Sequence, residues 1–309
     1  MLWVLVDASE LTLSVMDQPH LPLSRIPAEG IDLAKTLNSG QVFHWTEVGR
    51  GFVGAIDQEP CYLEQSGNEL LISRGSVPQV RRYLALDHRL DEIQSTFPKD
   101  PTLDAAVRYA SGIRILRQPA WECLATFLTS ALKQVAHIRS ISLLIRERYG
   151  RKLRVAGATV FSYPGPELLA KLGLDDLLAC RLGFRATNLL TAARMVATGE
   201  IALAGLTKLS SDEIRTVLCR FPGVGDKIAN CVLLFAFGRL EVMPIDVWIA
   251  RVLSEKYFPR KPKTRPAEFA AFCRQYFGPY AGYAQQYLFH HWRLTYPRSK
   301  KLRNPESRS

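Results

Sequence analysis

The chain has 309 residues, with 40 Lys and Arg against 29 Asp and Glu, and therefore a formal net charge of +11. Hydrophobic residues make up 47% of it, which excludes a disordered chain, and its apolar runs stop short of the ~18 residues that a membrane span needs. The excess of positive charge favours a polyanionic partner, nucleic acid first. No basic segment precedes the apolar N-terminus, so we expect an intracellular protein, in the cytoplasm or nucleoid of a prokaryote.

The first 75 residues have the short, turn-punctuated pattern of an antiparallel sheet. They predict an N-terminal β-rich domain over residues 1–100. The expected strands are Trp3 to Val6, Leu11 to Val15, Val42 to Trp45, Phe52 to Ile56, Tyr62 to Glu64 and Glu69 to Ser73.

From about residue 76 the apolar period changes to 3.6, which predicts an all-α region over 101–297 and a basic tail at 298–309. The fold class is therefore α+β. The segment 119–134 is apolar nearly all round and should be the buried central helix. The expected helices are 78–86, 101–111, 119–134, 137–149, 164–180, 185–198, 211–220, 226–237, 246–257, 266–276 and 279–295.

Residues 211–237 predict a helix-hairpin-helix. Ser210 opens a capping box that begins the first helix, and Gly223, Val224 and Gly225 then separate it from a second amphipathic helix. Glycines allow backbone N–H groups of the hairpin to approach a phosphate closely. The hairpin is therefore expected to clamp a DNA backbone without reading its base sequence.

Two residues near the hairpin suggest chemistry as well as binding. Lys227 stands at the mouth of the second helix, and Asp246 precedes a further helical segment. Taken singly, Lys227 could be a phosphate contact or a solvated lysine, and Asp246 an ordinary N-cap. A non-catalytic DNA-binding protein is thus the alternative, but the two residues together favour an enzyme.

Six stretches carry a resemblance to one family. They are FPGVGDKIANC and MPIDVWIARVL around the hairpin, with NSGQVFHW, RQPAWECLATFLTS, LGFRA and GPYAGYAQQYLF elsewhere in the same order. This pattern resembles the helix-hairpin-helix DNA glycosylases, and within them the 8-oxoguanine DNA glycosylase/AP lyases, in a bacterial-type form. The resemblance implies a DNA repair enzyme that flips 8-oxoguanine out of duplex DNA, preferentially opposite cytosine. A glycosylase for another damaged purine is the alternative within the fold.

The resemblance also implies catalytic roles. Lys227 matches the family nucleophile, which attacks C1′ of the sugar and carries the reaction through a Schiff base to strand cleavage by β-elimination. Asp246 matches the catalytic carboxylate, which stabilises positive charge on the sugar and assists the nucleophile. Capping and catalysis are compatible, because backbone N–H groups hold a carboxylate in place and keep it ionised.

Four uncharged residues match the base pocket of the family. Gly40 matches the glycine whose carbonyl accepts the N7 hydrogen that 8-oxoguanine has and guanine lacks. Gln285 and Phe289 share a helix face and match the residues that bond the base edge and stack on the base. Cys231 matches the wall on the other face. The simpler interpretations are a turn glycine, helix packing and a buried thiol.

The opposite strand is expected to meet a second set of residues. Arg185 matches the reader of the orphaned cytosine, and Phe184 occupies the position of an aromatic wedge. Gln41 and Phe43 are expected to shape the pocket mouth.

The chain also departs from the family. Leu132 and His137 stand where eukaryotic members have an asparagine and an arginine on the orphaned cytosine, so discrimination of the opposite base should be weaker. Trp248 replaces a phosphate-contacting histidine.

The expected partner is double-stranded DNA containing 8-oxoguanine, bound by a monomer without a membrane. No cofactor is expected to be required, although a monovalent or divalent cation could sit at the hairpin. The cysteines, at least twelve residues apart, exclude zinc and iron–sulfur spacing and read as reduced thiols, so we predict no metal ligands and no Fe–S cluster. They are Cys61, Cys123, Cys180, Cys219, Cys231 and Cys273.

Overall fold

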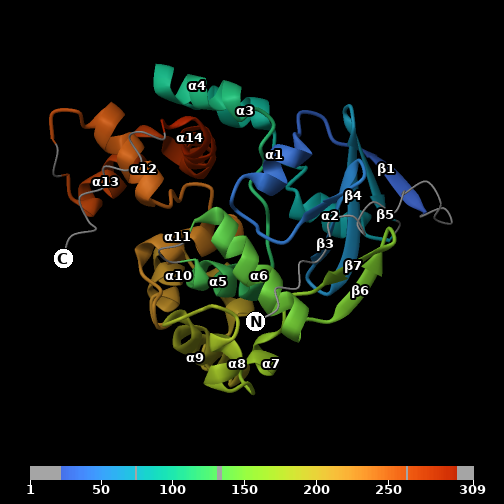
Figure 1. Cartoon of the computed structure of the whole chain (residues 1–309). Coiled ribbons are helices and arrows are strands. Elements are labelled where there is room, and N and C mark those ends of the chain that lie inside the picture. Colours follow the sequence, from blue (N-terminus) through green and yellow to red (C-terminus); the bar gives the residue numbers. More distant parts are fainter. Residues whose placement is uncertain (1–21, 74, 131–133, 262–263, 298–309) are drawn as a thin grey trace.

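A five-stranded antiparallel sheet forms the N-terminal part of the computed structural model, which describes residues 22–73, 75–130, 134–261 and 264–297 (Figure 1). The strands are arranged in the order β1-β5-β4-β3-β2, with Phe52 opposite Leu63 and Leu63 opposite Ile72. Their bounds are β1 Leu23–Pro27, β2 Thr46–Val48, β3 Gly51–Ile56, β4 Glu59–Ser66 and β5 Glu69–Ser73, and helices α1 Leu33–Asn38 and α2 Val77–Tyr83 accompany them. The predicted strands at 52–56, 62–64 and 69–73 are confirmed, whereas those at 3–6 and 11–15 lie outside the described residues.

The prediction of a strand at Val42 to Trp45 is wrong. This segment lies in a loop between α1 and β2, although three of its four residues are apolar. The pattern arises because its side chains enter two separate cores. Val42 and Trp45 are buried with the sheet, whereas Phe43 is buried among the helices. The loop therefore joins the two halves of the molecule.

Helices and one β-hairpin form the rest of the regular structure in the described chain, as predicted for an α+β fold. The predicted helix at 164–180 is instead two short helices, because Gly173 starts the second of them. The bounds are α3 Leu90–Ser95, α4 Pro101–Tyr109, α5 Ala120–Thr129, α6 Val135–Tyr149, α7 Pro166–Leu169, α8 Leu174–Leu178, α9 Arg185–Ala197, α10 Ser211–Leu218, α11 Asp226–Phe235, α12 Val247–Val252, α13 Pro266–Tyr276 and α14 Ala281–Thr295, with short 3-10 or π turns at Leu203–Lys208, Leu253–Tyr257 and Gly278–Tyr280.

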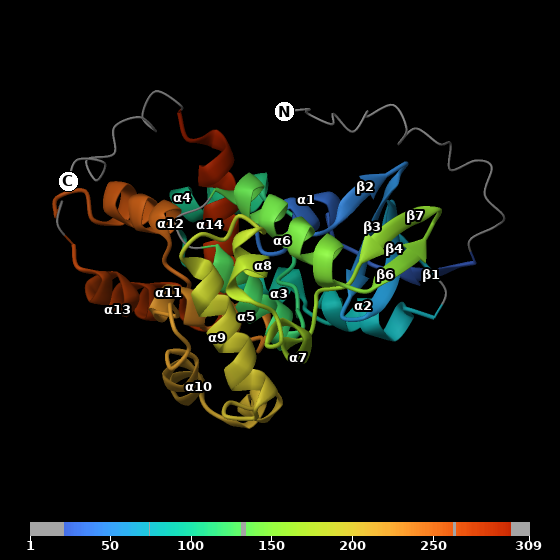
Figure 2. The same ribbon diagram turned by 60° about the horizontal axis from the view of Figure 1, so that its bottom comes forward.

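A β-hairpin inside the predicted helical region returns to the sheet. Its strands are β6 Lys152–Val155 and β7 Ala158–Phe161, and they lie beside β3 and β4 (Figure 2). Val155 and Val160 pack there against Val53 and Tyr62. This hairpin was not predicted from the sequence. The domain limits 1–100 and 101–297 stay a prediction.

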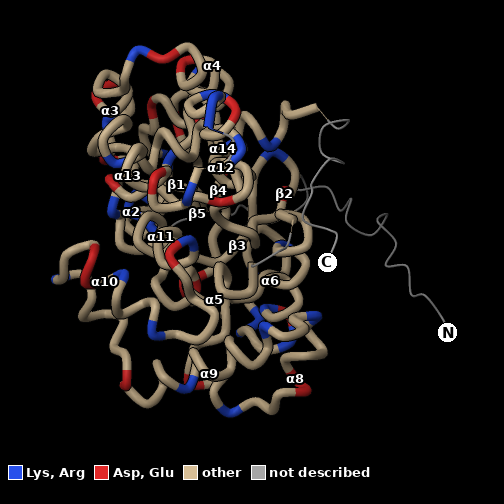
Figure 3. The backbone as a smooth tube through the Cα atoms, turned by 90° about the vertical axis from the view of Figure 1, so that its left-hand side faces the viewer, with Lys and Arg blue, Asp and Glu red and all other residues tan. Residues whose placement is uncertain are grey.

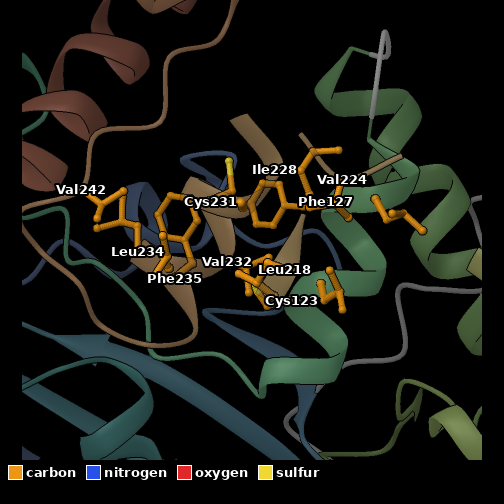
Figure 4. Packing of buried hydrophobic residues seen from close by; sticks show 14 of the residues in the cluster. Cys123, Phe127, Leu218, Val224, Ile228, Cys231, Val232, Leu234, Phe235 and Val242 are labelled. Atoms are coloured by element: carbon orange, nitrogen blue, oxygen red, sulfur yellow. The ribbon is translucent and has the colours of Figure 1, made fainter. Parts of the chain in front are cut away.

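Helix α5 is the buried centre of the helical part, as its apolar sequence predicted. All its residues from Glu122 to Thr129 are buried, and it packs against α11, α9 and α6. Figure 4 shows Cys123 and Phe127 of α5 facing Ile228, Cys231 and Val232 of α11. The central helix therefore fixes the position of the hairpin's second helix. No helix in the described ranges is long and apolar enough to cross a bilayer.

Candidate active site

The helix-hairpin-helix consists of α10, a turn at residues 219–225 and α11. Ser210 begins α10 with the predicted capping box. Gly223 has a φ of +81°, and a Cβ there would lie 2.3 Å from Asn188 Nδ2. Gly225 caps α11 with a φ of −105°, no side chain caps that end, and a Cβ on Gly225 would meet nothing within 4 Å. Val224 points into the core. The hairpin thus has a rigid side at Gly223 and an open side at Gly225.

Lys227 stands on the first turn of α11 and is half-buried. Its Nζ lies 5.6 Å from the centroid of the Phe127 ring. That ring is itself fixed, because it stacks on Phe235 at 5.5 Å and meets Phe43 edge-on at 6.0 Å. The amine is therefore held over an aromatic floor at the end of the hairpin. Phe43 belongs to this floor, and its predicted place at the pocket mouth stays a prediction.

Asp246 is the N-cap of α12. Its Oδ1 accepts hydrogen bonds from the backbone N–H of Trp248 at 3.0 Å and of Ile249 at 2.9 Å. Burial raises the pKa of the Asp246 carboxyl, while the Ile249 N–H bond, the charge of Lys227 and the Trp248 N–H bond oppose that rise. The capping interpretation is therefore correct, and it leaves the other carboxylate oxygen available for chemistry.

Cys231 lies one turn beyond Lys227 on the buried face of α11. Burial raises the pKa of its thiol to about 11, while the charge of Lys227 lowers it and that of Asp246 raises it. These three side chains consequently share one electrostatic environment. A thiol with that pKa is protonated at neutral pH, so Cys231 can form a wall but not a thiolate nucleophile.

A second group of predicted residues lies between α14 and the loop after α1. Gly40 has a φ of +89°, and a Cβ there would lie 3.0 Å from Phe289 Cε1. Gln285 is 5% exposed, and its Oε1 has no hydrogen-bond partner among the described residues. A buried amide oxygen without a partner is costly, and a ligand with a donor would relieve that cost. The free amide oxygen is what a recognition site would offer, and the role of these residues in binding a base stays a prediction.

Gln41 has a structural role that the sequence did not reveal. Its Nε2 donates to Ser39 Oγ at 2.9 Å and to the Arg114 carbonyl at 2.8 Å, and its Oε1 accepts from the Leu116 N–H at 2.8 Å. Both ends of the fully buried amide are occupied. Gln41 therefore fixes the Gly40 loop and does not line the pocket mouth.

The predicted wedge is prominently exposed. Phe184 is 63% exposed just before α9, whereas Arg185 is 4% exposed, with its guanidinium 4.2 Å from the Phe184 ring centroid. Arg185 Nη1 also donates to the Leu182 carbonyl at 3.3 Å, and burial lowers the pKa of Arg185. The arginine thus supports the wedge, and its contact with a cytosine stays a prediction. His137 is exposed on the first turn of α6, and Leu132 lies outside the described residues.

The Trp248 side chain packs against neighbouring side chains, whereas the histidine that it replaces would contact a phosphate. Its ring meets Tyr296 edge-on at 6.0 Å. The guanidinium of Arg251 lies 5.2 Å from the Trp248 ring centroid and 4.9 Å from that of Tyr296. Helix α12 therefore presents a cation from Arg251, held between two rings.

Lys and Arg positions lie on several elements of the described chain (Figure 3). Within the described ranges no group of three or more His, Cys, Asp or Glu could hold a metal ion. A cation bound at the hairpin stays a prediction, and no step below uses one.

Comparison with known proteins identifies the family. The solved structure of MBOgg1 in complex with a low-affinity DNA ligand shares 31% identity, covers 90% of this chain and 97% of that one, and superposes with a TM-score of 0.84. The chain belongs to the 8-oxoguanine DNA glycosylase/AP lyase family. It is therefore a DNA N-glycosylase with associated AP lyase activity, in the helix-hairpin-helix superfamily.

Other matches agree with this family. The family model described as the 8-oxoguanine DNA glycosylase N-terminal domain matches residues 24–124. A probable N-glycosylase/DNA lyase of Methanothermobacter thermautotrophicus is 29% identical and covers 88% of this chain and 96% of its own length. The 8-oxoguanine glycosylase/lyase of Clostridium acetobutylicum, solved with DNA containing cytosine opposite 8-oxoguanine, is 26% identical with a TM-score of 0.81, and covers 88% of this chain and 97% of its own.

Proposed function

We propose that this enzyme excises 8-oxoguanine from duplex DNA, preferentially opposite cytosine, through a Schiff base on Lys227. The observation that carries the proposal is that Lys227, on the first turn of α11 directly after the hairpin, lies near enough to the Asp246 carboxylate for their charges to interact. The 8-oxoguanine glycosylase/lyase of Clostridium acetobutylicum, a relative of the same fold, supports the choice of base.

The base must leave the helix before it can react, because its glycosidic bond is inaccessible in the stack. In the proposal, the backbone amides at Gly225 bind a phosphate, and the exposed ring of Phe184 fills the space that the extruded base leaves. Arg185 faces the orphaned cytosine. Because positions 132 and 137 lack the family's amide and guanidinium, the preference for cytosine should be shallower than in eukaryotic relatives.

The pocket distinguishes 8-oxoguanine from guanine by the hydrogen that 8-oxoguanine carries on N7. The Gly40 carbonyl accepts the N7 hydrogen of 8-oxoguanine, whereas guanine offers a lone pair there and leaves the carbonyl unsatisfied. The Oε1 atom of Gln285, which has no partner in the described chain, accepts a hydrogen bond from the base edge. Phe289 stacks on one face of the base, and Cys231 lies on the other face.

The chemistry uses two side chains. The neutral amine of Lys227 forms a bond to C1′ while the C1′–N9 bond breaks, and the base leaves with the electron pair and takes up a proton. The ionised carboxylate of Asp246 stabilises the positive charge that develops on the sugar. Opening of the sugar ring gives an imine between Lys227 and C1′. Loss of a C2′ proton then expels the 3′ phosphate oxygen, and water releases the lysine.

A panel of lesions tests the choice of base. Duplexes containing 8-oxoguanine, an alkylated purine or undamaged guanine opposite cytosine are incubated with the enzyme in single-turnover conditions. We expect release of 8-oxoguanine alone. Faster release of the alkylated purine would favour the other damaged-purine activity of this fold, and equal release of guanine would contradict the role of Gly40.

A further inference from the structure

One face of α14 binds the backbone at the C-terminal end of α1, just before Gly40. Arg293 Nη2 donates a hydrogen bond to the carbonyl oxygen of Asn38 at 3.2 Å. Gln286 Nε2 donates one to the carbonyl oxygen of Ser39, also at 3.2 Å. The two donors are seven residues apart, which is two turns of one helix. The same helix therefore holds the consecutive carbonyls of Asn38 and Ser39.

Arg293 also contacts the ring that closes the pocket. Its guanidinium lies 5.4 Å from the centroid of Phe289, one helical turn away, and that ring lies against Gly40. The charge of Asp246 acts on Arg293 as well. The Nε of Arg293 is buried and has no hydrogen-bond partner in the part of the chain that the structure describes. One guanidinium thus contacts the Phe289 ring and the backbone two residues before Gly40.

We infer that Arg293 is a specificity-determining positioning residue, which sets the separation between the Gly40 carbonyl and the Phe289 ring. A planar guanidinium suits this role, because its face packs on the aromatic ring while its edge donates to the loop carbonyl. The inference rests on the proposed function, since it assumes that a base occupies this space. If the inference is correct, excision of the base depends on Arg293, whereas strand cleavage at a site that already lacks its base does not.

Two substrates separate these steps. Arg293→Ala and Arg293→Lys are assayed in single turnover on a duplex with 8-oxoguanine opposite cytosine, and on a duplex with a preformed abasic site, which has no base to position. A misplacement of about 1 Å can cost ~10²-fold in rate, so we expect excision to fall at least about tenfold in both variants. Strand cleavage at the abasic site should stay within about twofold of wild type.

The lysine variant distinguishes position from charge. It keeps the positive charge near Asp246 but lacks the planar group, so wild-type excision by Arg293→Lys would overturn the inference. It also keeps the test open if the alanine variant does not fold. Arg274→Ala, which removes an exposed arginine from α13, is the matched control for net charge and should retain both activities.

Other results would also overturn the inference. A parallel fall of excision and abasic cleavage in variants with a wild-type melting temperature would mean that Arg293 does not act through the base pocket. Unchanged excision in both variants would mean that it has no role. If the wild-type enzyme itself released no 8-oxoguanine but cleaved abasic sites, the proposed function would fail before the inference was reached.

Discussion

The two hairpin glycines should respond in opposite ways to the same substitution. In Gly223→Ala the new methyl group is attached at a φ of +81° and would lie 2.3 Å from Asn188 Nδ2. A left-handed conformation costs a non-glycine residue roughly 1–2 kcal/mol, and moving the Asn188 side chain adds to that cost. In Gly225→Ala the φ of −105° is ordinary, and the methyl group meets nothing within 4 Å.

Thermal unfolding and duplex binding measure the two effects separately. Gly223→Ala should lower the free energy of unfolding by about 2 kcal/mol, which for a chain of this size is a fall in Tm of about 3 °C. Gly225→Ala should lower it by at most ~1 kcal/mol, the difference between glycine and alanine as an N-cap.

Binding should rank the variants the other way. The methyl group of Gly225→Ala occupies the open side of the hairpin, where a phosphate approaches the α11 amides, so its Kd for duplex DNA should rise about tenfold. If Gly225→Ala binds duplex DNA as tightly as wild type, a phosphate does not approach the hairpin on the Gly225 side. A Tm for Gly223→Ala equal to that of wild type would refute the strain argument.

Further predictions concern charge, insertion and pairing. Asp246→Asn should keep the free energy of unfolding within about 1 kcal/mol of wild type, because asparagine also caps helices, while excision falls by roughly 10²-fold or more. Burial raises the pKa of Asp246 and activity needs the ionised form, so the acid limb of the pH–rate profile should lie above the ordinary aspartate range; a limb at or below that range would contradict this. Phe184→Ala should slow single-turnover excision from duplex DNA but not cleavage of a single-stranded abasic substrate. Arg251→Ala should reduce the salt dependence of duplex binding by about one phosphate contact, and an unchanged slope would exclude that contact. Excision opposite C, T, G and A should show a shallow preference for C; a steep one would show that positions 132 and 137 are not needed for it.

The sequence predicted correctly those features that depend only on residues close together in the chain. The capping box at Ser210, the glycine break after it and the N-cap at Asp246 each depend on residues within one turn, and all three are present. The apolar character of α5 predicted its burial in the same way. The apolar character of Val42 to Trp45 misled the strand prediction, because composition alone does not tell which core receives each side chain.

Contacts between residues far apart in the chain could not be predicted from the sequence. Arg293 meets the Asn38 carbonyl across 255 positions of the chain, and Gln41 accepts from the Leu116 N–H across 75. Neither contact leaves a periodic signal, since a polar residue on a helix or loop can equally well face water. The chemistry-bearing residues could be found from short motifs, but the residues that hold them in place could be found only from the fold.

Covalent trapping tests the central claim most directly. Wild-type enzyme is incubated with a duplex containing 8-oxoguanine opposite cytosine in the presence of borohydride, which reduces an imine to a stable amine, and the protein–DNA adduct is resolved on a denaturing gel. We predict an adduct with wild type and none with Lys227→Gln, while Lys35→Gln, a change on the surface of α1, traps as wild type does. An adduct that persists in Lys227→Gln would contradict the assignment of the nucleophile.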